Sequence, residues 1–211
     1  MKKKNYCIKD DYTHRQEYIQ NIQINARDKF QDEVYHRARN IVDEHDYGKI
    51  LDIGCGSSFK LIKYFRDKYF LGLELEPNLS WLRETYPQFN YALSDYQSPP
   101  EEHFDLVICS DVIEHLLDPD KLLEFINKLN FKHFVVSTPE RNLIQQVQKQ
   151  MGWHVQENGP PANECHIREW TKSEFADYIS QAFKIEEHFI THIQKECQVV
   201  VATKYNENSF R

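Results

Sequence analysis

The chain has 211 residues, the size of one domain or of one domain with a short extension. Hydrophobic residues make up 40% of it and charged residues 28%, which suits a buried core beneath a polar surface. The formal net charge of −7 disfavours nucleic acid as a partner, and no apolar run is long enough to span a bilayer.

The amino-terminal residues and the cysteines predict the compartment of the protein. Residues 1–6 lack the apolar stretch of a signal peptide, so we predict a cytoplasmic protein without membrane insertion. The five cysteines are scattered, and no two of them have the C-x-x-C spacing of a zinc site. This usage is typical of free thiols in a reducing compartment.

From the amino terminus onward, helical patterns come first and short apolar runs follow. Residues 10–45 contain few helix breakers, and Val34, Ala38 and Ile41 recur at helical spacing. The runs predicted as strands are residues 49–53, 69–74, 104–109 and 131–136, and the helices between them are residues 59–65, 79–85 and 122–129. Asp118 and Pro119 are expected to open the last of these helices as its N-cap and first residue. Apolar strands separated by helices indicate a parallel sheet buried on both faces.

The carboxyl-terminal part differs from this alternation. Thr171 and Glu174 form a capping box that opens a helix reaching to about Phe183. Residues 185–193 and 198–203 are too close together for a crossover helix, so they should pair antiparallel. We therefore predict a single α/β domain over residues 1–211: a Rossmann-like doubly wound sheet, mostly parallel, with one antiparallel hairpin at an edge and helices on both faces.

A cofactor site is predicted at the end of the first strand. In such a sheet, ligands bind outside the carboxyl ends of the strands. Gly54 and Gly56 follow the first strand and let the backbone approach a ligand. Glu74 stands twenty residues after Gly54, where a carboxylate accepts both hydroxyls of a ribose. The dinucleotide fingerprint G-x-G-x-x-G fails because Phe59 occupies its last glycine position.

This segment resembles the first motif of class I S-adenosylmethionine-dependent methyltransferases, and the resemblance covers roughly residues 48–140. It implies that Asp52 orders the loop near the methionine ammonium group, while Gly54 and Gly56 pass beneath the methionine moiety. It further implies the following contacts: Glu74 with the ribose, Asp95 with the adenine amino group, Tyr96 alongside it, and Ser110 and Asp111 with the sulfonium region. Leu75 and Gln31 complete the expected cofactor-binding set. Ser58 replaces the family's third glycine, and its side chain is expected to narrow the pocket.

A second set of polar residues follows the strand at 104–109. If residues 111–115 are helical, Asp111, Glu114 and His115 share one face. Together with His166 they resemble the metal site of small-RNA 3′-terminal 2′-O-methyltransferases, which implies Mg²⁺ or Mn²⁺ gripping a vicinal diol. Asp111 is shorter than the glutamate of that family. Alternatively, the Glu-His pair only orders the loop, and His166 is a general base that takes the proton of a sugar hydroxyl.

Residues 159–170 resemble a subset of bacterial methyltransferases associated with glycan and surface-polysaccharide pathways. The resemblance implies that residues 1–45 form a helical lid over the donor, that residues 46–211 form the core, and that residues 139–170 form a substrate loop region. Within this loop, Arg168 would bind an anionic group or pair with Glu169. Trp170 would stack on a sugar or belong to the core.

Three functional hypotheses remain open from the sequence. The first is O-methylation of a carbohydrate, glycan precursor or related small molecule, with His166 and Asp111 as catalytic residues and Arg168, Glu169 and Trp170 contacting the substrate. The second is metal-dependent 2′-O-methylation of RNA 3′ ends, which predicts a basic groove that the sequence does not provide. The third is a non-catalytic protein that binds S-adenosylmethionine. The acceptor atom and the oligomeric state are left open.

Overall fold

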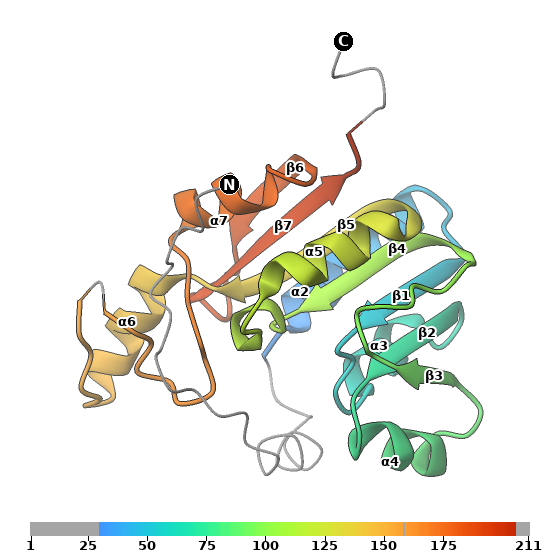
Figure 1. Ribbon diagram of the computed structural model, residues 1–211, viewed down its shortest axis with the longest axis horizontal. Helices are drawn as coiled ribbons and strands as arrows, with labels where there is room; N and C mark the ends of the chain where they lie inside the picture. The colour runs from blue at the N-terminus through green and yellow to red at the C-terminus, as the bar shows by residue number, and fades with distance from the viewer. Residues whose placement is uncertain (1–29, 158, 206–211) are drawn as a thin grey trace.

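The computed structural model describes residues 30–157 and 159–205, and its centre is a seven-stranded sheet in the order β3-β2-β1-β4-β5-β7-β6 (Figure 1). The strands are β1 (Lys49–Ile53), β2 (Tyr69–Glu74), β3 (Asn90–Leu93), β4 (His103–Ser110), β5 (Asn130–Pro139), β6 (Lys184–Ile190) and β7 (Cys197–Thr203). The helices are α2 (Asp32–Glu44), α3 (Phe59–Phe65), α4 (Asn78–Thr85), α5 (Pro119–Lys128), α6 (Arg141–Gln150) and α7 (Lys172–Ile179), with a 3₁₀ turn, η1, at Ile113–His115.

The sheet confirms the predicted fold class. Strands β1 to β5 are mutually parallel, whereas β7 pairs antiparallel with both β5 and β6. The last two strands therefore form the predicted antiparallel hairpin at one edge. Consecutive strands run outward in opposite directions from β1 and β4, so the topological switch point lies between these two strands.

Two hydrophobic clusters cover the two faces of the sheet. Alternate residues of each strand point to opposite faces, so that Ile50 joins one cluster and Leu51 the other. Helices α2, α3 and α4 supply the cluster that contains Ile50, while α5 and α7 supply the cluster that contains Leu51. Burial on both faces explains why the central strands are apolar throughout rather than alternating.

Helix ends follow the sequence signals only in part. The capping box of α7 is confirmed: Thr171 accepts from the Glu174 N–H, and the Glu174 carboxylate accepts from the Thr171 N–H. Helix α7 ends at Ile179, earlier than predicted, because the chain must turn to bury Phe183 before β6 begins. Pro119 is the first residue of α5 as predicted, but Asp118 makes no capping hydrogen bond through its side chain.

Three parts of the fold were not predicted correctly. Strand β3 and helix α6 were missed; β3 is a short edge strand whose last residue, Leu93, is exposed, and α6 lacks a core-facing apolar side. Residues 111–115 are not one helix, because Asp111 has a left-handed backbone (φ 52°) and only η1 follows it. Helix α2 lies within the predicted helical stretch 10–45, of which residues 10–29 lie outside the described residues. No helix among the described residues is long and apolar enough to cross a membrane.

Candidate active site

A cavity of about 700 Å³ opens at the carboxyl ends of β1, β2 and β4, beside the switch point. Much of its lining consists of residues that the sequence predicted for the site: Gln31, Gly54, Gly56, Glu74, Leu75, Tyr96, Ser110, Asp111, Glu114, His115 and His166. The fold thus brings the predicted cofactor-binding and catalytic segments to one space. Among the lining residues that the structure describes, Lys60 is the single lysine or arginine.

The loop after β1 requires glycine at its first turn. Gly54 has φ 74°, and a Cβ atom there would lie 2.5 Å from Cγ2 of Val112. A side chain at this position would therefore force the loop and the segment after β4 apart. Ser58 also has a positive φ of 58°, but its Oγ accepts a hydrogen bond from Tyr91 Oη at 3.0 Å and the residue is buried. Ser58 does not line the cavity, which corrects the expectation that it narrows the pocket.

Glu74 is oriented by the backbone around it. Its Oε2 accepts from the Gly56 N–H at 2.6 Å, and its Oε1 accepts from the Leu75 N–H at 2.8 Å. Burial raises the pKa of this carboxyl, and these N–H groups oppose the shift by stabilising the charged form. A carboxylate oxygen can accept two hydrogen bonds, so capacity remains on Glu74 for the two hydroxyls of a ribose.

Asp52 lies behind the cavity rather than in its wall. It is fully buried, and its Oδ2 accepts from Tyr35 Oη at 2.7 Å. Its Oδ1 has no hydrogen-bond partner among the described residues. Burial raises the pKa of Asp52 to about 7, although the Tyr35 hydroxyl acts in the opposite direction. Asp52 thus links α2 to the base of the glycine loop, and its ionised form destabilises the folded protein.

Of the two residues predicted to contact adenine, Tyr96 lies in the cavity wall and Asp95 on the protein surface. Tyr96 lines the cavity and packs edge-on against Phe125. Asp95 is exposed and does not line the cavity; its Oδ1 accepts from the N–H groups of Gln97 and Ser98, at 2.8 and 3.0 Å. Those N–H groups lower the pKa of Asp95. The contact between Asp95 and the adenine amino group stays a prediction.

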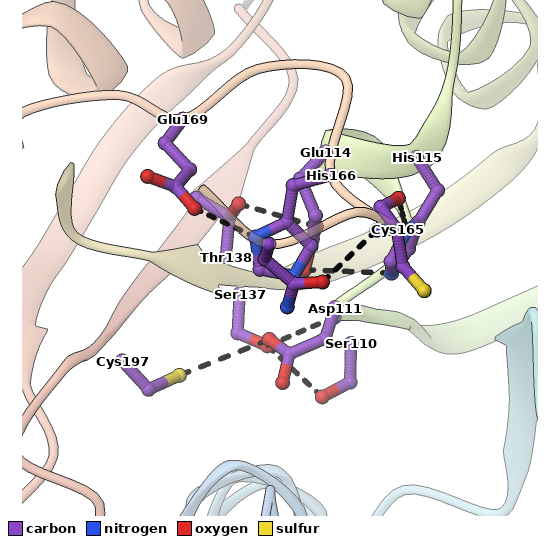
Figure 2. A network of polar contacts seen from close by, with 11 residues as sticks. Ser110, Asp111, Glu114, His115, Ser137, Thr138, Cys165, His166, Glu169 and Cys197 are labelled. Atoms are coloured by element: carbon purple, nitrogen blue, oxygen red, sulfur yellow. Dashed lines mark hydrogen bonds and ion pairs between the residues drawn. The ribbon is translucent and has the colours of Figure 1, made fainter. Parts of the chain in front are cut away.

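Asp111 sits at the end of β4 in a network of hydroxyl groups (Figure 2). Its Oδ1 accepts from Ser137 Oγ at 2.6 Å, and Ser137 in turn lies 2.9 Å from Ser110 Oγ. The Cys197 thiol approaches the same carboxylate oxygen at 3.8 Å. Burial raises the pKa of Asp111, while hydrogen bonds from Ser137 and Gln31 act to lower it.

His166 and His115 stand in the wall next to Asp111, and each has a partner on its Nδ1 (Figure 2). The His166 Nδ1–H donates to the buried Glu169 carboxylate at 2.7 Å, so its Nε2 is the basic nitrogen, and it accepts from Asn163 Nδ2 at 3.1 Å. The His115 Nδ1–H donates to the Cys165 carbonyl at 2.6 Å, which leaves its Nε2 unprotonated in the neutral ring. The two rings meet edge to face, with centroids 5.2 Å apart.

A metal-capable cluster is present, but it is smaller than predicted. Ligand atoms of Glu114, His115 and His166 all lie within 4.8 Å of one another, and Asp111 does not belong to this group. Glu114 is buried, and its Oε2 accepts from Thr138 Oγ1 at 3.2 Å. Burial, and next the neighbouring Asp111, raise the pKa of Glu114. An acceptor on Nδ1 of each histidine is the usual support of metal-binding imidazoles, so the three residues fit a divalent cation.

The three predicted substrate residues do not line the cavity. Trp170 is fully buried and stacks on Tyr178 in the core, which corrects the prediction that it stacks on a sugar. Arg168 is buried and donates to the Leu117 carbonyl at 2.6 Å, so its charge ties two loops together rather than facing the cavity. Glu169 is buried as well, and it supports His166 instead of contacting a substrate.

Three residues with functional contacts gave no sequence signal of their roles. Tyr35 reaches Asp52 from α2, Ser137 reaches Asp111 from β5, and Asn163 reaches His166 within the loop before α7. Tyr35 and Ser137 act across a separation of many residues, which no local pattern encodes. Asn163 belongs to the segment 159–170, but its contact depends on how that loop folds.

Comparison with known proteins gives a family and a fold. Residues 15–184 match the model of a family described as a methyltransferase domain. No curated protein matches the chain.

Solved structures with the same fold include the PH0226 protein of Pyrococcus horikoshii OT3, at 18% identity and TM-score 0.63, covering 90% of this chain and 92% of that one. They also include magnesium protoporphyrin IX methyltransferase of Synechocystis PCC 6803 with bound S-adenosylhomocysteine, at 15% identity and TM-score 0.61, covering 83% and 84%. A third is the N-methyltransferase NodS of Bradyrhizobium japonicum WM9, at 13% identity and TM-score 0.64, covering 90% and 98%.

Proposed function

Because this chain belongs to the methyltransferase-domain family, we propose that it transfers a methyl group from S-adenosylmethionine to a hydroxyl oxygen of a carbohydrate, glycan precursor or related small molecule. One observation carries the proposal: a single cavity is lined both by the loop Gly54–Gly56 with Glu74 and by a histidine supported by a buried carboxylate. The first set suits the donor, and the second suits removal of a proton from the acceptor.

The chemistry requires alignment and one proton acceptor. S-adenosylmethionine, held by Glu74 and the loop Gly54–Gly56, would supply a methyl group on a sulfonium sulfur, which would become a neutral thioether when the hydroxyl oxygen took that group. The hydroxyl proton passes to Nε2 of His166, and Glu169 stabilises the imidazolium that forms. Asn163, which donates to this nitrogen, must release it to the substrate. The remaining contribution is the placement of the oxygen in line with the sulfonium carbon.

Donor binding tests the proposal without knowledge of the acceptor. We expect the protein to bind S-adenosylhomocysteine and Glu74→Ala to weaken that binding by roughly 10- to 100-fold, since hydrogen bonds to a charged group contribute about 1.5–3 kcal/mol. Calorimetric titration measures both values. Glu76→Ala is the matched control, because Glu76 is exposed and does not line the cavity. Equal affinities of Glu74→Ala and the native protein would contradict the assignment of Glu74.

A second candidate function is metal-dependent 2′-O-methylation of RNA 3′ ends, and the Glu114–His115–His166 cluster favours it. A divalent cation there would supply positive charge to orient a vicinal diol. The charge of the cavity wall disfavours RNA as the substrate. Lys60 is its single lysine or arginine among the described residues, and binding of a phosphate backbone normally needs several such side chains. Methyl transfer to RNA oligonucleotides with free and with blocked 3′ diols separates the two candidates.

The metal itself is tested by titrating Mn²⁺ into metal-free protein saturated with S-adenosylhomocysteine. If the cluster is a metal site, we expect binding in the micromolar range, and at least a tenfold loss in Glu114→Gln and in His166→Ala. Asp111→Asn should retain most of the affinity, since Asp111 lies outside the three-residue group. If the native protein gives no heat of Mn²⁺ binding, both the metal site and the analogy with methyltransferases of RNA 3′ ends are contradicted.

A further inference from the structure

Helix α6 buries polar side chains and leaves its apolar ones half-buried or exposed. Arg141, Gln145 and Gln148 are buried, and their spacing puts them on one side of the helix. Arg141 fixes this side to the protein: its Nη1 donates to the Glu169 carbonyl at 3.2 Å, and its Nη2 pairs with Glu174 at 2.8 Å. A surface helix normally does the reverse and turns its apolar residues inward.

The apolar residues of α6 gather on another side. Leu143, Ile144, Val147 and Met151, which we call the apolar face of α6, fall within a sector of roughly 100° at the helical rotation of about 100° per residue. None of the four belongs to either hydrophobic cluster of the sheet. The first three are half-buried, and Met151 is 66% exposed. Figure 1 shows why: α6 stands beyond the end of the sheet rather than against one of its faces.

This apolar face is continuous with the active-site cavity. Ile144 lines the cavity together with His166 and Leu117, and Leu117 is itself 71% exposed. The face therefore begins inside the cavity and runs outward along the helix to Met151. It carries no charged residue; Lys149, on another side of α6, pairs with Glu157 at 2.7 Å.

We propose that the apolar face of α6 binds an apolar chain or ring carried by the acceptor, whose hydroxyl group is then methylated beside His166. This inference rests on the proposed function and specifies its substrate: an amphiphile whose hydroxylated end enters the cavity. The apolar part gains its binding free energy by leaving water for the surface of Ile144, Val147 and Met151. The net charge of −7 makes an anionic bilayer a poorer occupant than a single amphiphilic molecule.

Two glucosides that share a headgroup test this proposal. Octyl β-D-glucoside, below its micellar concentration, and methyl β-D-glucoside are titrated into the full-length protein saturated with S-adenosylhomocysteine. We expect the octyl compound to bind at least tenfold more tightly. Val147→Asp should remove this preference, because it puts a charge in the middle of the apolar face. Leu93→Asp is the matched control: Leu93 is 54% exposed at the end of β3, outside the cavity lining, and the preference should persist.

Each result is decisive for one of the two proposals. Equal affinities of the two glucosides, or the same loss in Leu93→Asp as in Val147→Asp, would overturn the assignment of the apolar face. A dimer in sedimentation analysis that Val147→Asp dissociates would overturn it too, by assigning the face to a second copy of the chain. Thermal unfolding checks that both variants are folded. If the native protein fails to bind S-adenosylhomocysteine, the proposed function itself is contradicted.

Discussion

Replacement of His166 by alanine is expected to lower kcat for methyl transfer by roughly 10²–10⁴-fold, the range attributed to a positioned general base. His166 lines the cavity, and its Nδ1 is held by the buried carboxylate of Glu169. Alanine leaves no group to take the hydroxyl proton. The measurement is transfer of radioactive methyl groups from S-adenosylmethionine to the most active compound in a panel of methyl and octyl glycosides.

The controls separate catalysis from binding and folding. Affinity for S-adenosylhomocysteine should be unchanged in His166→Ala, because the glycine loop and Glu74 remain intact. Glu169→Gln should show a smaller loss of kcat with little change in KM, since the imidazole stays in place but loses its charged partner. His154→Ala, at an exposed histidine outside the cavity lining, should retain full activity. A His166→Ala variant with native kcat would show that another group takes the proton.

Asp52→Asn is expected to stabilise the cofactor-free protein at alkaline pH while it weakens cofactor binding. Burial raises the pKa of Asp52 to about 7, so between pH 4 and pH 7 the folded protein holds a proton that the unfolded chain has released. The native protein therefore loses stability relative to the variant as the pH rises through this window. A shift of about three pKa units corresponds to an upper value of about 4 kcal/mol, and we expect about 2–4 kcal/mol above pH 7.

Urea unfolding of both proteins at pH 5 and pH 8 measures this effect. The gain in stability of Asp52→Asn at pH 5 should be about a third of its gain at pH 8, while its affinity for S-adenosylhomocysteine falls at least tenfold. Asp95→Asn is the comparison, and it should lower stability rather than raise it, because backbone N–H groups lower the pKa of that exposed carboxylate in the folded protein. The same variant tests the predicted adenine contact. If the free energies of unfolding of Asp52→Asn and the native protein differ by the same amount at both pH values, the raised pKa of Asp52 does not destabilise the protein.

The sequence was sufficient for most of the fold because most of its signals are local. Strand β1 and helix α3 were predicted with their observed bounds, since an apolar run and a helical repeat follow directly from burial on both faces of the sheet. The capping box at Thr171 and the closely spaced last two strands are equally local. Helix α6 was missed for the opposite reason: its buried side is polar, and its apolar face lies outside both hydrophobic clusters of the sheet.

The sequence by itself also predicted which residues come together: the glycine loop, Glu74, Asp111, Glu114, His115 and His166 all line one cavity. Only the tertiary structure decided what each side chain does there. Trp170 and Arg168 turned inward because the loop before α7 packs on the core, and Glu169 came to hold His166 for the same reason. Asp111 left the metal-capable group because its left-handed backbone aims its carboxylate at Ser137. Side-chain direction depends on contacts between segments far apart in the chain, which residue type and spacing do not encode.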